Sequence, residues 1–392
     1  MVYGDLVEDV RHHLAREPQR LSRARVASAV AAQGGAVLGA HGVLRAADAV
    51  HAELAGAGVL EQVLREPGVT DVLVNGPDEI WVDRGTGLER VGLTFRDEAE
   101  VRRLAVRLAV GAGRRLDAAT PFVDAWLPGG VRIHAVLPPI AATPYLSLRI
   151  PSRRAFSLDD LQNRGMITAF GAELLKRIIG MRLSFLVTGE TGSGKTTLLG
   201  SLLGSVAQRE RIVIIEDVPE LQVTHPHVLR LQARPPNTEG AGGVDLSRLV
   251  REALRMRPDR LIVGEVRGPE CVDLLAALNV GHDGCAGTLH ANAASAVPAR
   301  LEALATAAGL NRAAVHSQIA AGLHAVVHLK RDREGRRKLA EVGAVRRLRT
   351  GLVEVVPALV ADDDGELRPE VGFEEFGRML GGPAEPSLGA CP

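Results

Sequence analysis

Several residue types are scarce in this chain of 392 residues, and each scarcity excludes a class of protein. Three cysteines without a C-x-x-C pair cannot form the disulfide framework of a small secreted domain or a four-cysteine zinc module. Aromatic residues make up only 3% of the chain, which leaves few side chains on which a nucleic-acid motor could stack bases. The formal net charge is zero, so the chain lacks the basic excess of a protein that grips nucleic acid through its phosphates.

Long hydrophobic runs are also lacking. No apolar stretch reaches the roughly 18 residues of a membrane-spanning helix, and the first residues lack the basic-then-apolar pattern of a signal peptide. The apolar share of 46% and the charged share of 24% are those of a globular protein, and the sparse cysteines suit a reducing compartment. We therefore expect a cytoplasmic protein that binds no nucleic acid and associates with a membrane only peripherally, through partner proteins.

A glycine-rich motif stands between a strand-like segment at 183–187 and a helix-compatible segment at 197–203. Residues 189–196 fit the pattern G-x-x-x-x-G-K-[ST], in which backbone N–H groups and a helix N-terminus surround phosphates. We expect Lys195 to reach the β- and γ-phosphates of ATP and Thr196 to ligate Mg²⁺. The predicted nucleotide-binding residues are Gly189, Glu190, Thr191, Gly192, Ser193, Gly194, Lys195, Thr196 and Thr197.

Changes in hydrophobic pattern divide the chain into five segments. Residues 1–66 are expected to be helical, with Leu6, Val10 and Leu14 at helical spacing and a break at Pro18. Short strands, turns and one helix over 97–111 then predict an α+β domain at 67–152. The remaining segments are a linker with one helix (153–182), a motor domain (183–365) and a poorly ordered tail rich in Gly and Pro (366–392).

Strand and helix signals alternate after residue 183. This alternation predicts an α/β fold with a mainly parallel sheet, helices on both faces and the nucleotide at the carboxyl ends of the strands. The strands predicted in the motor domain are 184–188, 211–216, 260–265, 286–289, 324–329, 338–346 and 352–360. Those predicted in the preceding α+β domain are 71–75, 80–83, 122–127, 131–137 and 145–150.

Two of the apolar strands end in carboxylates. The strand at 260–265 ends in Glu265, in the position of a Walker B element, and the strand at 211–216 ends in Glu216 and Asp217. Carboxylates at the carboxyl end of a strand beside a phosphate-binding loop can hold Mg²⁺ or orient the attacking water. With Thr196, these acids predict the metal and water chemistry of γ-phosphate cleavage.

These motifs resemble those of the secretion and pilus ATPases that power type II secretion, type IV secretion and type IV pili. The I-E-D-x-x-E-L run at 215–221 resembles their Asp box, residues 254–268 their arginine-rich approach to Walker B, and residues 281–292 their His box. Within that superfamily the chain is most similar to the motors of tight-adherence (Flp, Tad) pili and to conjugation-associated ATPases. The resemblance extends upstream to segments 68–76, 130–134 and 146–151, so that it covers roughly residues 60–330.

The resemblance implies a RecA-like P-loop NTPase motor domain, preceded by a smaller α+β domain and a helical N-terminal segment. It also implies a hexameric ring in which each nucleotide lies between an N-terminal domain and a motor domain. Arg132 and Arg149 match the arginines that reach the γ-phosphate from the N-terminal domain, and Arg257 matches an interface arginine of the motor domain. Guanidinium groups suit this role because they stabilise charge on phosphoryl oxygens.

Glu265 is the predicted residue for positioning or activating water, and Glu216 is predicted to help hold Mg²⁺, although the two roles could be exchanged. The metal ligands expected are therefore Thr196, Glu216 and Glu265. His290 is expected on the γ-phosphate side, and His282 is a weaker candidate. An alternative reading joins His282, Cys285 and His290 into a zinc site, but it lacks a fourth ligand.

Some features depart from the family's pattern or leave the interpretation open. Pro219 stands in the Asp box where small or polar residues are more usual, and Cys285 and Ala286 replace a serine-containing stretch. The glycine-rich loop 237–243 could move with nucleotide or be an idle connection. The charge run 331–338 is read most simply as an exposed hairpin turn, with contact to an acidic partner or anionic lipid as the alternative.

The sequence thus predicts an Mg-dependent ATPase that forms a homo-hexamer and drives pilus assembly or secretion through an inner-membrane platform protein. Two other functions remain open. One is a conjugal DNA-transfer or other nucleic-acid motor, and the other is a nucleotide-gated scaffold with little turnover.

Overall fold

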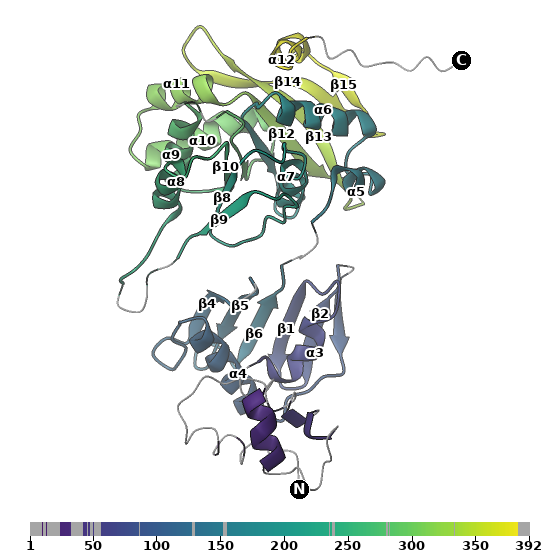
Figure 1. Cartoon of the computed structure of the whole chain (residues 1–392), viewed down its shortest axis with the longest axis vertical. Helices are drawn as coiled ribbons and strands as arrows, with labels where there is room; N and C mark the ends of the chain where they lie inside the picture. Colours follow the sequence, from purple (N-terminus) through teal and green to yellow (C-terminus); the bar gives the residue numbers. More distant parts are fainter. Residues whose placement is uncertain are drawn as a thin grey trace, which may run out of the picture. The chain divides into compact units, whose positions relative to one another are not determined.

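The chain divides into two compact units, Met1–Ser152 and Arg153–Pro392. The computed structural model is drawn in Figure 1. It describes residues 56–382 except 86, 128–129, 152–154, 235, 237–239, 280, 282 and 333, and, before them, residues 10, 13, 24–32, 42–44, 46–47 and 50.

The described residues among the first 50 are helical, whereas Leu6, Leu14 and Pro18 lie outside the described residues. Their apolar side chains, among them Val10, Val26 and Val50, form a small buried cluster. Next come a 3-10 turn, η1 (Gly58–Leu60), and the short helix α3 (Glu61–Leu64). No helix in the described part of the chain is both long enough and apolar enough to cross a bilayer.

A six-stranded sheet with the order β3-β2-β1-β6-β5-β4 forms the body of the first unit. All its strand pairs are antiparallel, and buried and exposed residues alternate along β4, β5 and β6. The buried face packs on helix α4 (Glu98–Gly111), which Asp97 caps by accepting from Glu100 N–H. The strands are β1 (Asp71–Gly76), β2 (Glu79–Asp83), β3 (Leu88–Val91), β4 (Phe122–Trp126), β5 (Arg132–Val136) and β6 (Tyr145–Arg149).

The second unit is built on a nine-stranded sheet with the order β15-β14-β13-β12-β7-β11-β10-β8-β9. The strands from β12 to β9 in this order pair in parallel, and β13, β14 and β15 add antiparallel ladders at one edge. The sheet is therefore mixed. Its strands are β7 (Phe185–Gly189), β8 (Ile212–Glu216), β9 (Val228–Gln232), β10 (Arg260–Val266), β11 (Ala286–Leu289), β12 (Ala325–Arg331), β13 (Arg337–Arg347), β14 (Val353–Ala361) and β15 (Leu367–Pro369).

Helices cover both faces of this sheet (Figure 1). One buried cluster joins one face to the apolar sides of α5 (Leu158–Asn163), α6 (Ala169–Gly180), α7 (Lys195–Leu203) and α12 (Phe373–Met379). The second cluster joins the other face to α8 (Leu246–Leu254), α9 (Glu270–Leu278), α10 (Val297–Ala307) and α11 (Arg312–Gly322). Because the central strands are buried on both sides, they are continuous apolar runs rather than alternating ones.

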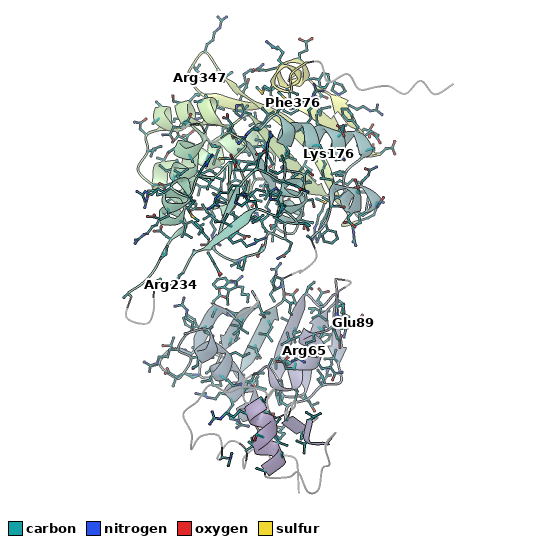
Figure 2. The ribbon with its side chains drawn as sticks, viewed as in Figure 1. Arg65, Glu89, Lys176, Arg234, Arg347 and Phe376 are labelled. Atoms are coloured by element: carbon teal, nitrogen blue, oxygen red, sulfur yellow. The ribbon has the colours of Figure 1, made fainter. Side chains whose placement is uncertain are left out.

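Three segments differ from the sequence-based expectation. The tail that was expected to be poorly ordered instead forms β15 and α12, because Phe376 and Leu380 are buried in the core on one side of the sheet. Phe376 is labelled at α12 in Figure 2. Residues 383–392 lie outside the described residues. The expected linker contains two helices, and α5 begins with a capping box between Ser157 and Asp160. Strand β9, which was not predicted, is a partly exposed edge strand without a buried apolar run.

Candidate functional site

The glycine-rich loop connects β7 to α7 at the carboxyl end of a buried parallel strand. Gly189 and Gly194 have φ values of 145° and 96°, which side-chain-bearing residues rarely adopt. A Cβ atom at Gly189 would lie 2.5 Å from the carbonyl oxygen of Leu329, so this position also has no room for a side chain. The buried Ser193 hydroxyl has no hydrogen-bond partner among the described residues. A glycine cradle with an unpaired hydroxyl at a helix N-terminus fits a bound phosphate.

Lys195, the first residue of α7, is buried beneath this loop. Its Nζ donates to the carbonyl oxygens of Gly189 at 3.0 Å and Glu190 at 2.8 Å. Burial lowers the pKa of Lys195, and the nearby carboxylates of Glu265 and Glu220 oppose that shift. The ammonium group is thus placed among the loop's carbonyl groups, in a setting where phosphate oxygens would be well-matched acceptors.

His290 links the lysine to the Walker B carboxylate. Glu265 lies near the end of β10, and His290 directly follows β11, its neighbour in the sheet. The Nε2 atom of His290 is 2.8 Å from Oε1 of Glu265, and its Nδ1 atom is 3.4 Å from Nζ of Lys195. The carboxyl ends of three parallel strands thus bring Lys195, His290 and Glu265 into one hydrogen-bonded group. A carboxylate, an imidazole and an ammonium group together can hold a water or a phosphate oxygen and move a proton.

Glu216 has different surroundings from those expected of a metal ligand. Its side chain is 4% exposed, and Oε1 accepts from the N–H groups of Glu220 at 2.9 Å and Leu221 at 2.8 Å. The other oxygen is 3.2 Å from Nη1 of Arg230 on β9. Burial raises the pKa of Glu216 to about 7, against the effects of these donors. These are the contacts of a residue that holds the turn after β8. In the part of the chain that the structure describes, its hydrogen bonds and its ion pair are with this turn and with β9, and none is with the glycine-rich loop.

Glu220 is a site residue that the sequence reasoning did not single out. It belongs to the Asp box, and its carboxylate is close enough to oppose the lowering of the Lys195 pKa by burial. The signal available in the sequence was the second glutamate of the I-E-D-x-x-E run, four residues after Glu216. The structure therefore assigns two different surroundings to the two glutamates of this box.

The β12–β13 hairpin, which is distant in sequence, also forms hydrogen bonds with the glycine-rich loop. Nε and Nη2 of Arg331, the last residue of β12, donate to the carbonyl oxygen of Gly192 at 3.1 and 2.8 Å. Nε of Arg337, the first residue of β13, donates to the same oxygen at 2.9 Å. Burial and the charge of Arg331 lower the pKa of Arg337. The segment 331–338 is a hairpin turn, as predicted, but its first and seventh residues contact the P-loop rather than a partner.

Replacing both hairpin arginines tests whether they position the loop. In Arg331→Gln/Arg337→Gln we expect the dissociation constant of ATP to rise about tenfold, because the three hydrogen bonds from charged guanidinium groups that fix the Gly192 carbonyl are lost. Calorimetric titration of ATP measures this change. The matched control removes two exposed arginines from the β13–β14 turn, in Arg347→Gln/Arg349→Gln. Equal affinities in the two variants would contradict a positioning role.

Arg132 and Arg149 lie on neighbouring strands of the first unit and are register partners. Arg132 donates to the carboxylate of Asp124 at 2.8 and 2.6 Å, and this contact lowers the pKa of Asp124. Its guanidinium group also lies 5.6 Å from the ring centroid of Trp126. The first unit therefore gathers the two predicted arginines on the exposed face of its sheet.

Arg257 lies at the opposite sheet edge from the glycine-rich loop. It precedes β10, and β10, β11 and β7 are parallel, so about 17–20 Å of strand separates it from the loop of its own chain. The structure therefore does not bring Arg257 to its own nucleotide-binding loop.

The zinc alternative falls partly outside the described residues, since His282 is not described. Cys285 is buried before β11, and burial raises its thiol pKa to about 12, which disfavours the thiolate that zinc binds. Among the described residues, no three His, Cys, Asp or Glu side chains are grouped so that they could hold a metal ion.

Fold and site together define a P-loop protein of the α/β class, with an acid, a histidine and a lysine at the carboxyl edge of its parallel strands. The sequence profile of the family described as Type II/IV secretion system protein matches residues 53–355. The chain belongs to that family, which confirms the resemblance predicted from its motifs.

Individual relatives agree with this assignment. A putative conjugal transfer protein of Mycobacterium tuberculosis (strain H37Rv) is 53% identical over 333 residues, or 83% of this chain and 94% of the relative. The probable conjugal transfer protein TrbB of Sinorhizobium fredii is 31% identical over 297 residues, or 74% of this chain and 88% of the relative. The crystal structure of the ATPase DotB from Legionella pneumophila shares the fold, with a TM-score of 0.51 at 18% identity over 74% of this chain and 80% of DotB.

Proposed function

We propose that this protein is an Mg-dependent ATPase that converts ATP hydrolysis into domain motion and powers a type II or type IV secretion or pilus machine. The observation that carries the proposal is the group formed by Lys195, His290 and Glu265 beside the glycine-rich loop. A P-loop alone would suit any nucleotide-binding protein. A carboxylate and a histidine next to the P-loop lysine add the means to orient water against a γ-phosphate.

The residues take separate roles in this proposal. Lys195 and the backbone N–H groups of the loop bind the β- and γ-phosphates, and the Thr196 hydroxyl would hold Mg²⁺, which supplies charge neutralisation during phosphoryl transfer. Glu265 orients the attacking water and accepts its proton. His290 fixes the Glu265 carboxylate through its 2.8 Å contact. Glu216 supports the turn that carries Glu220, so we assign it an indirect role.

Arg132 and Arg149 remain our candidates for arginines that stabilise the γ-phosphate charge. Their proximity on one exposed face supports a joint role, since guanidinium groups suit phosphoryl oxygens. Arg257 remains a candidate for contact with a neighbouring subunit of a homo-hexamer. Its distance from the P-loop of its own chain keeps it away from its own nucleotide, which supports contact with the nucleotide of another copy.

We further propose a cytoplasmic position at the inner membrane, with a membrane platform protein as partner. The relatives named for conjugal transfer favour a conjugation-like system over the tight-adherence pilus within the range of functions predicted. A motor that acts directly on nucleic acid is the second candidate, and those same names are the observation in its favour. The zero net charge and the few aromatic residues stand against it.

The test is steady-state phosphate release by the full chain with ATP, with and without Mg²⁺, combined with the oligomeric mass in the same samples. We expect release that requires Mg²⁺ and a mass of six subunits. Tight ATP binding without phosphate release, even with the platform protein present, would instead support a nucleotide-gated scaffold. Stimulation of release by single-stranded DNA would favour the nucleic-acid motor.

A further inference from the structure

We propose that the amino-terminal edge of the parallel strands in the second unit carries a second anion site, which binds a phosphate-bearing ligand. A cavity of about 460 Å³ lies at this edge. Its volume is in the range of small-molecule pockets. The cavity is lined by Arg209, Arg211, His227, Met256, Arg257 and Asp259.

The sheet topology explains why these residues meet. Arg211, His227 and the residues before Arg260 directly precede the neighbouring strands β8, β9 and β10, which run in parallel. Ile212 N–H donates to the carbonyl oxygen of His227 at 3.0 Å, and Arg260 N–H donates to that of Arg211 at 3.1 Å. The order of the parallel strands therefore forms the cavity at their amino-terminal ends, whereas the P-loop lies at their carboxyl ends. It is a separate place on the molecule and not an extension of the nucleotide site.

The charge of the cavity favours an anion. It holds three guanidinium groups, one imidazole and one carboxylate. The Asp259 carboxylate accepts from the backbone N–H of Arg211 at 2.8 Å, so one of its oxygens is turned into the fold. Nη1 of Arg211 is 3.1 Å from Nε2 of His227, while its buried Nε has no hydrogen-bond partner among the described residues.

Arg209 and Arg257 are exposed at the mouth of the cavity. Within the described part of the chain, neither side chain forms an ion pair or a hydrogen bond. Guanidinium groups bind phosphate oxygens through paired N–H donors, and several of them around a hollow match a phosphate better than a single carboxylate. A phosphate ester is therefore the ligand class that this arrangement fits.

The backbone supplies an independent observation. In the described residues only Arg182 and Arg257 combine a side chain with a positive φ, 54° in each case. Both lie at this amino edge, and Arg182 donates to the carbonyl oxygen of Asp259 at 2.8 Å. Such positions favour glycine or asparagine, and strained residues gather at binding sites. Glycine would adopt the left-handed backbone conformation at position 257 with less strain. The chain has Arg257 there instead, which places a guanidinium group at the cavity.

The experiment titrates inorganic pyrophosphate into the full chain by calorimetry, in a Lys195→Ala background that removes phosphate binding at the P-loop. We expect one remaining site. Adding Arg209→Ser and Arg257→Gly should weaken it at least about tenfold, because two charged hydrogen-bond donors are lost. Glycine at position 257 accepts the positive φ, so this variant should fold at least as well as its parent.

The control adds Arg347→Ser and Arg349→Ser instead, which removes the same charge from an exposed turn; Figure 2 shows Arg347 directed into solvent. Pyrophosphate affinity should not change in the control. Absence of a site in Lys195→Ala, or equal weakening in both variants, would overturn the proposal. Loss of oligomeric mass in the Arg209/Arg257 variant without any pyrophosphate site would show a subunit contact instead, and would also overturn it.

Vesicles distinguish the two sources of a phosphate ester. If the ligand is a lipid headgroup, the protein should float with phosphatidylglycerol vesicles but not with phosphatidylcholine vesicles, and the Arg209/Arg257 variant should float less than the control. If the ligand is a free phosphate ester, pyrophosphate should bind without flotation on either vesicle. None of these experiments measures ATP turnover, so their results test the anion site independently of the ATPase proposal.

Discussion

Glu265→Gln should bind ATP with nearly wild-type affinity and release phosphate at least about 100-fold more slowly than the wild type. The amide keeps the size of the side chain and can still accept a hydrogen bond from His290, which is 2.8 Å from Oε1 in the wild type. It cannot accept a proton from the attacking water. The expected signature is therefore a loss of turnover with ATP affinity and oligomeric mass unchanged, measured by phosphate release, calorimetric titration and mass determination on the same samples.

A matched control keeps this prediction specific. Glu354→Gln makes the same change in charge on β14, where Glu354 pairs with Arg346 at a half-exposed position of the second unit. We expect it to retain nearly full activity. If Glu265→Gln kept more than half of the wild-type rate, the base would have to be sought elsewhere, and Glu220, which acts on Lys195, would be the first residue to replace.

The fold of the motor unit could be predicted where burial dominates. Strands β7, β8, β10 and β11 lie within a residue or two of their predicted ranges, because each is a short apolar run bounded by polar turns. Strand β9 escaped prediction because it is an edge strand in which Arg230 interrupts the apolar pattern. Helix α12 escaped because a single buried aromatic residue, Phe376, anchors a seven-residue helix in a glycine-rich setting.

Only those site residues that belong to a local sequence motif, or that directly follow a predicted parallel strand, could be predicted. The P-loop motif identified Lys195, and the parallel alternation explains why Glu265 and His290 meet it at one sheet edge. The hydrogen bonds from Arg331 to Gly192 form because β12 lies next to β7 in the sheet, although the two residues are about 140 positions apart in the sequence. No local sequence pattern encodes that strand order. The surroundings of Glu216 depend on which side of β8 its carboxylate faces, which a fully apolar strand does not reveal.

Glu216 should make the second unit less stable as pH rises, and Glu216→Gln should remove that dependence. Burial raises its pKa from 4.5 to about 7 in the folded protein. The unfolded chain therefore releases this proton at lower pH than the folded chain does, so stability is lost as pH rises from about 4.5 to about 7 and stays lost above it. At 1.36 kcal/mol per pKa unit, this rise of about 2.5 in the pKa corresponds to a loss of at most about 3.4 kcal/mol.

The amide variant separates this effect from the hydrogen bonds of the turn. A glutamine carbonyl can accept from the N–H groups of Glu220 and Leu221 as Oε1 does at 2.9 and 2.8 Å. At pH 5 we expect Glu216→Gln and the wild type to be about equally stable, and at pH 8 we expect the variant to be more stable by about 1–3 kcal/mol. Glu216→Ala leaves both N–H groups without a partner and should cost about 2–3 kcal/mol at pH 5.

Hydrogen exchange of peptides covering 212–232 is the suitable measurement, because both tryptophans, Trp81 and Trp126, lie in the first unit and their fluorescence would follow that unit. The difference between variant and wild type at each pH cancels the titration of other groups. If Glu216→Gln were less stable than the wild type at pH 8, the ion pair with Arg230 at 3.2 Å would outweigh the cost of burial. The expected result would instead mean that the buried Glu216 carboxyl keeps its proton up to about pH 7, where about half of it is protonated. The protonated form can hold the turn but serves poorly as a ligand for Mg²⁺.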